Sequence, residues 1–305
     1  MEIKEKKEAY TNGWFRERAF SSLKKIGDHS WDYSDSLLLY TPGTESEYES
    51  IQKGEDPYSE LITKPERKYL EEIAESVVRQ LPSEFEYVDL GPGTAHKEQF
   101  IFDAAKKARK NFIYRPVDIS EYYLDQAANY ASAQNIDVLP TQSSFEELPE
   151  KSPKSSSSRL VSLGLTFTNY ESQEILSLLK AAAGEGGYIF VDAQMRDRVD
   201  MEKIVSTYAK DVRALSDPKL KLLGLDPVAD VADYKTNDGV QMWYTLKNSN
   251  PVLEEKGIGA GDELLMFQSL RYTKESFEEA LKATGLSYTL FDTNESFIGA
   301  LLKTS

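Results

Sequence analysis

The sequence predicts an α/β protein built on a parallel sheet, with a smaller unit inserted after the fifth strand. Helix-length and strand-length apolar patterns alternate from residue 65 to about residue 195. This alternation is typical of a parallel sheet that is covered by helices on both faces. A glycine-rich turn follows the first of these strands, at the sheet edge where open α/β sheets bind ligands.

The alternating elements begin with PERKYLEEIAESVVRQL (65–81), whose apolar residues recur at helical spacing. EYVDL (86–90) is an apolar run that predicts a buried strand. A helix over 96–110, a strand over 112–120, a helix over 121–133 and a short strand near 136–139 follow. After a loop rich in serine and proline, we expect a strand over 160–167, a helix over 172–184 and a strand over 187–194.

The pattern changes at about residue 195. Residues 195–270 combine a helix near 204–215 with short alternating segments such as VQMWYTLK, which indicates an inserted unit. A helix (KESFEEALKATG) and two strands (SYTLFD and SFIGALL) after residue 271 are predicted to complete the far edge of the sheet. We therefore expect four segments: 1–64, 65–194, 195–270 and 271–305.

Composition excludes several functional classes. The 305 residues contain 36 Lys and Arg against 51 Asp and Glu, a net charge of −15, which is unsuited to binding nucleic acid or anionic lipid. The absence of cysteine excludes disulfides and thiolate catalysis, and two histidines leave little for a metal site. No signal peptide or membrane span is apparent. We expect a cytoplasmic monomer without a metal, a nucleic-acid partner or a membrane partner.

The turn in DLGPGTAH (89–96) predicts a nucleoside cofactor. Gly91 and Gly93 allow a ligand to approach the main chain, and the N-terminus of the following helix supplies N–H donors and positive potential. Asp118 ends the next predicted strand, where its carboxylate could accept hydrogen bonds from two ribose hydroxyls. These features belong to one edge of the sheet.

Three alternatives to this interpretation differ in their sequence requirements. A phosphate-binding loop requires Gly-Lys-Ser/Thr, which does not follow here. A dinucleotide site requires a third glycine where the sequence has His96. The turn could also be an ordinary connection between a strand and a helix. The form D-x-G-x-G-T followed by an acid at the next strand end resembles the first motif of Rossmann-like S-adenosylmethionine methyltransferases.

Further motifs support this resemblance over most of the chain. They are ITKPERKYLEEIAE, DLGPGTAHKEQFIFDA, YRPVDIS, SSFEELP, SLGLTFTNYESQE and GAGDELLMFQSLRYT. In this order and spacing, from Tyr58 to the C-terminus, the sequence resembles the histidine-specific Nα-methyltransferase family of ergothioneine biosynthesis. The resemblance implies a Rossmann-like class I methyltransferase sheet with an inserted smaller α+β substrate domain, to which residues 1–64 contribute. It also implies S-adenosyl-L-methionine as cofactor.

The resemblance assigns most of the cofactor contacts to the turn and the strand after it. Gly91 and Gly93 would pass close to the methionine and ribose, with Thr94 beside them, and Asp118 would bind the ribose hydroxyls. Asp89 could either contact the cofactor or brace the glycine turn.

The adenine side of the resemblance is less complete. Ser144 and Phe145 fall where the family has an Asp-Phe pair. Phe145 could pack on the base, whereas Ser144 lacks the acid that usually pairs with the exocyclic amine.

The acceptor side combines matches with one departure. Asn169 and Tyr208 match residues that hold the carboxylate of the amino-acid substrate, and Ser269 is retained. Phe267 replaces the glutamate that recognises histidine, and a phenyl ring cannot pair with an imidazole N–H. We therefore expect a neutral clamp for a carboxylate and an acceptor other than histidine.

The predicted reaction is an in-line methyl transfer to the amino group of an amino acid or a related small amine. The cofactor carries the reactive carbon, and the protein aligns the groups and excludes water. No residue is assigned as the base. Two alternatives are methylation of a secondary metabolite or a peptide terminus, and a catalytically silent cofactor-binding protein.

Overall fold

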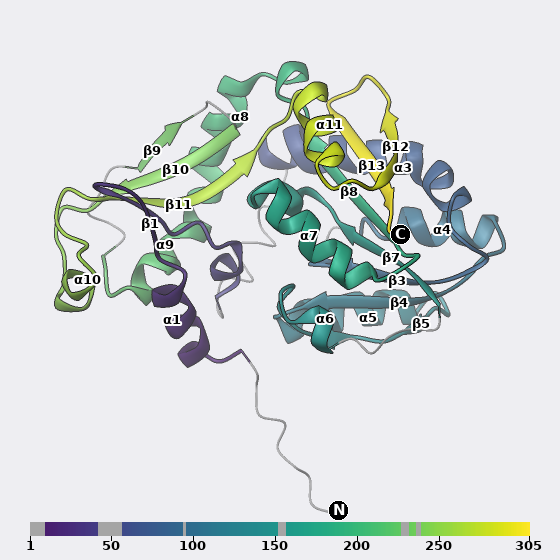
Figure 1. Cartoon of the computed structure of the whole chain (residues 1–305), viewed down its shortest axis with the longest axis horizontal. Coiled ribbons are helices and arrows are strands. Elements are labelled where there is room, and N and C mark those ends of the chain that lie inside the picture. Colours follow the sequence, from purple (N-terminus) through teal and green to yellow (C-terminus); the bar gives the residue numbers. More distant parts are fainter. Residues whose placement is uncertain (1–9, 42–56, 94–95, 152–156, 227–231, 236–238) are drawn as a thin grey trace, which may run out of the picture.

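The computed structural model describes residues 10–41, 57–93, 96–151, 157–226, 232–235 and 239–305, and in these residues it contains two β-sheets. The sheets lie side by side, the larger with its helices on one side of Figure 1 and the smaller on the other. The larger sheet has eight strands in the order β12-β13-β8-β7-β3-β4-β5, with β6 also paired to β4. The smaller has five strands in the order β1-β2-β11-β10-β9.

The larger sheet reverses its strand order next to β3. Strand β3 is parallel to both β4 and β7, which lie on opposite sides of it, and β13 is antiparallel to β8. The chain thus builds outward through β4 and then returns to β7, so the carboxyl ends of β3 and β7 flank the switch point where such sheets bind ligands. The strands are β3 (Glu84–Leu90), β4 (Asn111–Asp118), β5 (Asp137–Val138), β6 (Thr141–Gln142), β7 (Ser158–Leu163), β8 (Tyr188–Gln194), β12 (Ser287–Asp292) and β13 (Phe297–Lys303).

Helices cover both faces of this sheet. Successive residues of a strand point to opposite faces, so neighbours along β3 pack against different helices. Tyr87 packs in the core with α3, α4 and α5, whereas Val88 packs with α7 and α11. None of the helices in the described ranges is long and apolar enough to cross a membrane. The helices are α3 (Lys64–Arg79), α4 (Gln99–Lys107), α5 (Glu121–Ser132), α6 (Leu148–Lys151), α7 (Ser172–Ala183) and α11 (Lys274–Lys282).

The smaller sheet combines segments that are far apart in the chain. Strand β2 pairs in parallel with β11, so the sheet contains both residues 24–32 and residues 232–270. The predicted boundaries at residues 64, 194 and 270 stay predictions. The strands are β1 (Lys24–Gly27), β2 (Ser30–Asp32), β9 (Ala232–Lys235), β10 (Gly239–Thr245) and β11 (Glu263–Leu270), and the neighbouring helices are α1 (Asn12–Ser21), α8 (Met201–Thr207), α9 (Arg213–Leu222) and α10 (Pro251–Glu255).

The predicted strand over 160–167 is too long. Strand β7 ends at Leu163, and a 3-10 helix over Leu165–Asn169 follows, in which the Phe167 N–H donates to Gly164 O at 2.8 Å. The apolar residue at position 167 reflects burial and not a place in a strand. The Phe167 ring is fully buried against Tyr272, with 5.9 Å between the ring centroids. Asn169 therefore ends a helical turn instead of a strand.

Four more short turns occur in the described part of the chain. Two are 3-10 helices, Ser36–Tyr40 and Arg196–Arg198, and two are π-helical turns, Ser59–Thr63 and Tyr208–Val212. The last of these continues α8 into α9 and begins at the predicted substrate residue Tyr208.

Candidate active site

The glycine turn lies at the switch point, directly after β3. Gly91 and Gly93 have φ of 67° and 59°, which side chains disfavour, and the Gly91 N–H donates to Val117 O at 2.9 Å. A Cβ atom at Gly91 would lie 3.5 Å from the Phe145 ring, so glycine keeps the space between turn and ring open. Thr94 lies outside the described residues.

A pocket over this turn brings together most of the predicted cofactor residues. Asp118 and Phe145 line it with Gly91 and Gly93. Asp118 is 7% exposed, its Oδ1 accepts from Ser120 N at 2.8 Å, and burial raises the pKa of its carboxyl to about 7. One buried carboxylate among apolar and aromatic side chains suits a ribose and its base. The other lining residues are Leu37, Tyr40, Ile119, Tyr123 and Thr166.

Two further predicted residues have structural partners. Asp89 accepts a hydrogen bond from Tyr114 OH at 2.9 Å, and burial together with the charge of Glu98 raises the pKa of Asp89 to about 7. The Ser144 N–H donates to Tyr10 OH at 2.7 Å, and its hydroxyl accepts from Glu147 N at 3.4 Å. Ser144 thus joins the N-terminal segment, through Tyr10, to the loop that follows β6. It is not among the described residues that line the pocket of Asp118 and Phe145.

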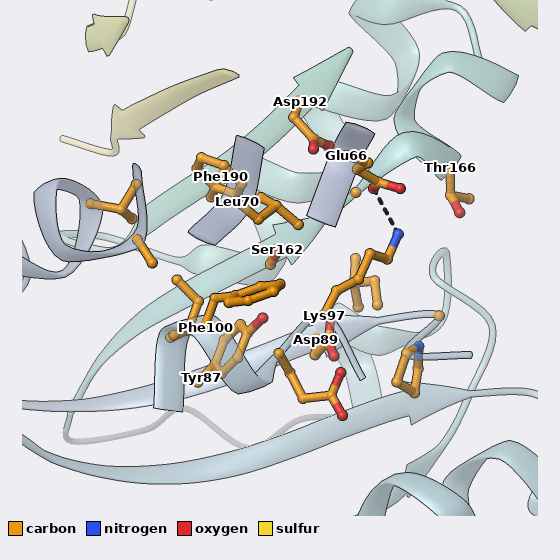
Figure 2. A pocket seen from close by; sticks show the side chains of 18 of the residues that line it. Glu66, Leu70, Tyr87, Asp89, Lys97, Phe100, Ser162, Thr166, Phe190 and Asp192 are labelled. Carbon is orange, nitrogen blue, oxygen red and sulfur yellow. Dashed lines mark hydrogen bonds and ion pairs between the residues drawn. The ribbon is translucent and has the colours of Figure 1, made fainter. Parts of the chain in front are cut away.

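A second pocket adjoins the first and contains charged residues that the sequence patterns did not single out (Figure 2). Both pockets are lined by Gly91 and Thr166. In the second, Lys97 Nζ lies 2.7 Å from Glu66 Oε1, and Figure 2 shows the Asp192 carboxylate turned toward Glu66. Their proximity is confirmed at Gly164, where a Cβ atom would meet Glu66 at 3.3 Å, Lys97 at 3.4 Å and Asp192 at 3.7 Å.

The second pocket places one cation among buried acids. Burial alone would lower the pKa of Lys97, but Glu66 and Asp192 raise it, so the ammonium form is favoured. Asp192 is fully buried, and within the described chain neither of its carboxyl oxygens has a hydrogen-bond partner. Burial and the Glu66 charge raise the pKa of Asp192 well above its usual value. An ammonium group beside Asp192 would favour its ionised form, so the pocket could receive both ends of a zwitterionic ligand.

The same acids do not form a metal centre. Among the residues the structure describes, no group of three or more His, Cys, Asp or Glu side chains is arranged to hold a metal ion.

The structure brings three of the predicted acceptor-side residues together. The Tyr208 and Phe267 ring centroids are 5.7 Å apart, and Tyr208 OH lies 3.3 Å from Ser269 Oγ. Tyr208, Phe267 and Ser269 are all at least 95% buried. The Tyr58 ring adds a second aromatic face, 5.6 Å from Tyr208.

Asn169 takes a different position. It lines a polar pocket with Gln268 and Arg18, and the described lining of that pocket includes neither Tyr208 nor Ser269. The preceding residue, Thr168, lies 3.2 Å from Ser269 through their hydroxyls. Asn169 therefore follows a residue that contacts the acceptor-side cluster, while Asn169 itself lines a separate cavity.

These features define a class of protein. A Rossmann-like sheet with a glycine turn, a buried acid at the end of the next strand and an adjoining charged pocket at its switch point is typical of a class I methyltransferase. A family model described as histidine-specific methyltransferase, SAM-dependent, matches residues 35–217. The chain belongs to this family, and it is an S-adenosylmethionine-dependent methyltransferase.

Solved structures add distant similarities. A SAM-dependent methyltransferase from Clostridium acetobutylicum is 14% identical over 85% of this chain and 96% of its own, with a TM-score of 0.44. The DhpI–SAH complex is 13% identical over 89% of this chain and 96% of its own, with a TM-score of 0.48. A comparison with curated protein sequences found no match.

Proposed function

We propose that this enzyme transfers a methyl group from S-adenosylmethionine to the amino nitrogen of an amino acid or a related small amine other than histidine. The observation that best supports this proposal is the pair of adjoining pockets that share Gly91 and Thr166. One has the buried carboxylate and rings that suit a nucleoside. The other has the cation and acids that suit the amino-acid end of the same molecule.

The residues present suit each part of the cofactor, which supplies an electrophilic methyl group when bound. Asp118 would accept hydrogen bonds from the ribose hydroxyls, and Phe145 would pack on the adenine. Lys97 would hold the methionine carboxylate, and the unpartnered Asp192 its ammonium group. Asp89, which accepts from Tyr114, would brace the glycine turn.

On the acceptor side, Tyr208 would hold the carboxylate through its hydroxyl, and Asn169 would complete the clamp by turning its amide toward the acceptor. Phe267 packs against the Tyr208 ring and leaves an apolar wall where histidine recognition needs a polar partner. An apolar or aromatic acceptor side chain is therefore favoured.

Tyr58 would act as a hydrogen-bond donor and an aromatic face instead of a base. Burial raises the pKa of Tyr58 well above 10, so its hydroxyl keeps its proton at neutral pH. The faces of Tyr58 and Tyr208 would stabilise the methylated ammonium product through cation–π attraction. The acceptor must react as the free amine.

An acceptor panel tests this function. We expect an apolar or aromatic amino acid to gain one or more methyl groups by mass spectrometry, with kcat/KM for histidine at least about tenfold lower because the imidazole would be left unpaired against Phe267. Efficient methylation of histidine would contradict the role of Phe267. Transfer to no amine in the panel would contradict the proposed reaction.

Replacing Asn169 by alanine tests whether its amide reaches the acceptor. A hydrogen bond to a carboxylate is worth about 1.5–3 kcal/mol, so we expect KM for the acceptor to rise roughly tenfold or more. The dissociation constant of S-adenosylhomocysteine, measured by calorimetry, should stay unchanged. The reverse pattern would place Asn169 at the cofactor or in the scaffold.

A further inference from the structure

Arg271 is a buried cation that follows β11, beside the acceptor-side cluster. It is 3% exposed, and arginine is seldom buried unless an acid pairs with it. Among the described residues, no carboxylate lies within ion-pairing distance of its guanidinium. All of its hydrogen bonds go to neutral oxygens: Tyr208 OH at 2.9 Å, Ser269 Oγ at 2.6 Å, Leu270 O at 3.0 Å, Gln194 Oε1 at 3.1 Å and Ser269 O at 3.4 Å.

These hydrogen bonds fix the direction of the Tyr208 hydroxyl. Arginine can only donate, so the oxygens of Tyr208 and Ser269 both accept from Arg271. The Tyr58 ring packs beside Tyr208, with 5.6 Å between the ring centroids. With its oxygen accepting from Arg271, Tyr208 keeps its own hydrogen for donation to another oxygen.

The Ser269 hydroxyl has a nearby acceptor of its own. Thr168 Oγ1 lies 3.2 Å from Ser269 Oγ and donates its own hydrogen to a main-chain carbonyl, so Ser269 is the donor in that contact. By elimination Tyr208 is the donor in its own contact with Ser269 Oγ, a long hydrogen bond of 3.3 Å that a ligand carboxylate can replace with a stronger one.

We propose that Arg271 makes the acceptor pocket selective for amines that carry a free carboxylate. It does so by holding the Tyr208 hydroxyl as a donor and by supplying a positive charge that has no described carboxylate within ion-pairing distance. This inference rests on the proposed function and adds a cation to the neutral clamp that the sequence predicts. Arg271 is a positioning residue, since it acts on the acceptor through Tyr208.

Arg271 also has a structural contact, which the test must separate from this role. Its Nε donates to Gln194 at the end of β8, and Gln194 Nε2 donates to Leu61 O at 2.8 Å. Loss of Arg271 could therefore loosen the junction between the two sheets. A loosened junction would affect all acceptors alike, whereas loss of carboxylate recognition would affect only those with a carboxylate.

The test compares matched acceptors, tryptophan with tryptamine and phenylalanine with phenethylamine, in the presence of saturating S-adenosylhomocysteine. By calorimetry, the unmodified enzyme should bind the acid of at least one pair about tenfold or more tightly than its amine. Arg271→Gln should reduce that preference to within about threefold by weakening the acid alone, and Arg271→Lys should restore part of it. Tyr208→Phe removes one hydroxyl, leaves the packing in place, and should reduce the preference similarly.

Each outcome decides the matter. Equal weakening of acid and amine, or no acid preference in the unmodified enzyme, would overturn the role of Arg271. If Arg271→Gln does not fold, an unchanged preference in Tyr208→Phe would also overturn it. Methyl transfer is measured separately on the same pairs: transfer without acid preference refutes this inference alone, and acid-selective binding without transfer refutes the proposed reaction.

Discussion

Asp118→Asn is expected to weaken the binding of S-adenosylhomocysteine by about 100-fold. The carboxylate can accept hydrogen bonds from both ribose hydroxyls, whereas the amide keeps one acceptor oxygen and presents N–H donors in place of the other. Losing one or two hydrogen bonds to a charged group accounts for an effect of roughly this size. Calorimetric titration measures it, and unchanged affinity would remove Asp118 from the ribose site.

The same variant should stabilise the cofactor-free protein. Burial raises the pKa of Asp118 to about 7 in the folded chain, above its value of about 3.9 in an unfolded one. Ionised Asp118 therefore opposes folding above pH 7, and this cost shrinks as pH falls from 7 toward 4. We expect Asp118→Asn to raise the free energy of unfolding at pH 8 by on the order of 1–2 kcal/mol, with a smaller gain at pH 5.

Measuring both affinity and stability of Asp118→Asn distinguishes a role of Asp118 in ligand binding from a role in supporting the fold. Urea unfolding without cofactor at the two pH values measures the stability difference. A variant that lost both stability and affinity would indicate that Asp118 mainly supports the fold. A variant that gained stability while losing affinity would show that the buried charge is kept for the ligand.

Cofactor affinity should also depend on pH. Asp118 must be ionised to accept both ribose hydrogens, so the affinity of the unmodified enzyme should fall as pH drops below about 7. Asp118→Asn should lose most of this slope. Any slope that remains reports on the other two buried carboxyls with a raised pKa, Asp89 and Asp192.

Local sequence patterns predicted the parts of the site that local rules control. The apolar run before Gly91, the two glycines and the acid ending the next strand are each set by a few neighbouring residues, and the structure places them at one sheet edge. The same rules failed at Phe167, where an apolar residue is buried in a helical turn. Periodicity reports burial and does not by itself distinguish a short strand from such a turn.

The charged pocket could not be predicted in this way. Glu66 lies in the amphipathic pattern of α3 and Asp192 in the apolar pattern of β8, and neither segment indicates that they meet Lys97. Such contacts depend on how distant elements pack. The parallel pairing of β2 with β11 is equally non-local, as is the contact between Arg271 and Tyr208, which are 63 residues apart.

Lys97→Met is expected to lower both the stability of the protein and its affinity for the cofactor. Glu66 is 2% exposed and is paired with Lys97 at 2.7 Å, and Asp192 lies beside them without a hydrogen-bond partner in the described chain. Removing one partner of a fully buried ion pair leaves the other charge uncompensated and typically costs about 3–5 kcal/mol, and we expect a smaller loss here because the Lys97 side chain is 24% exposed. Urea unfolding measures this loss, and calorimetry measures the affinity for S-adenosylhomocysteine.

The double variant Glu66→Gln/Lys97→Met distinguishes the two effects. Neutralising Glu66 removes the uncompensated charge, so most of the lost stability should return, while the missing cation should still leave the methionine carboxylate unpaired. We therefore expect near-normal unfolding together with at least about tenfold weaker S-adenosylhomocysteine binding. If stability and affinity recover together, Lys97 serves only to neutralise Glu66, and the methionine carboxylate must be held by another group. If affinity alone stays low, the cation that compensates Glu66 in the free protein is also the one that receives the cofactor.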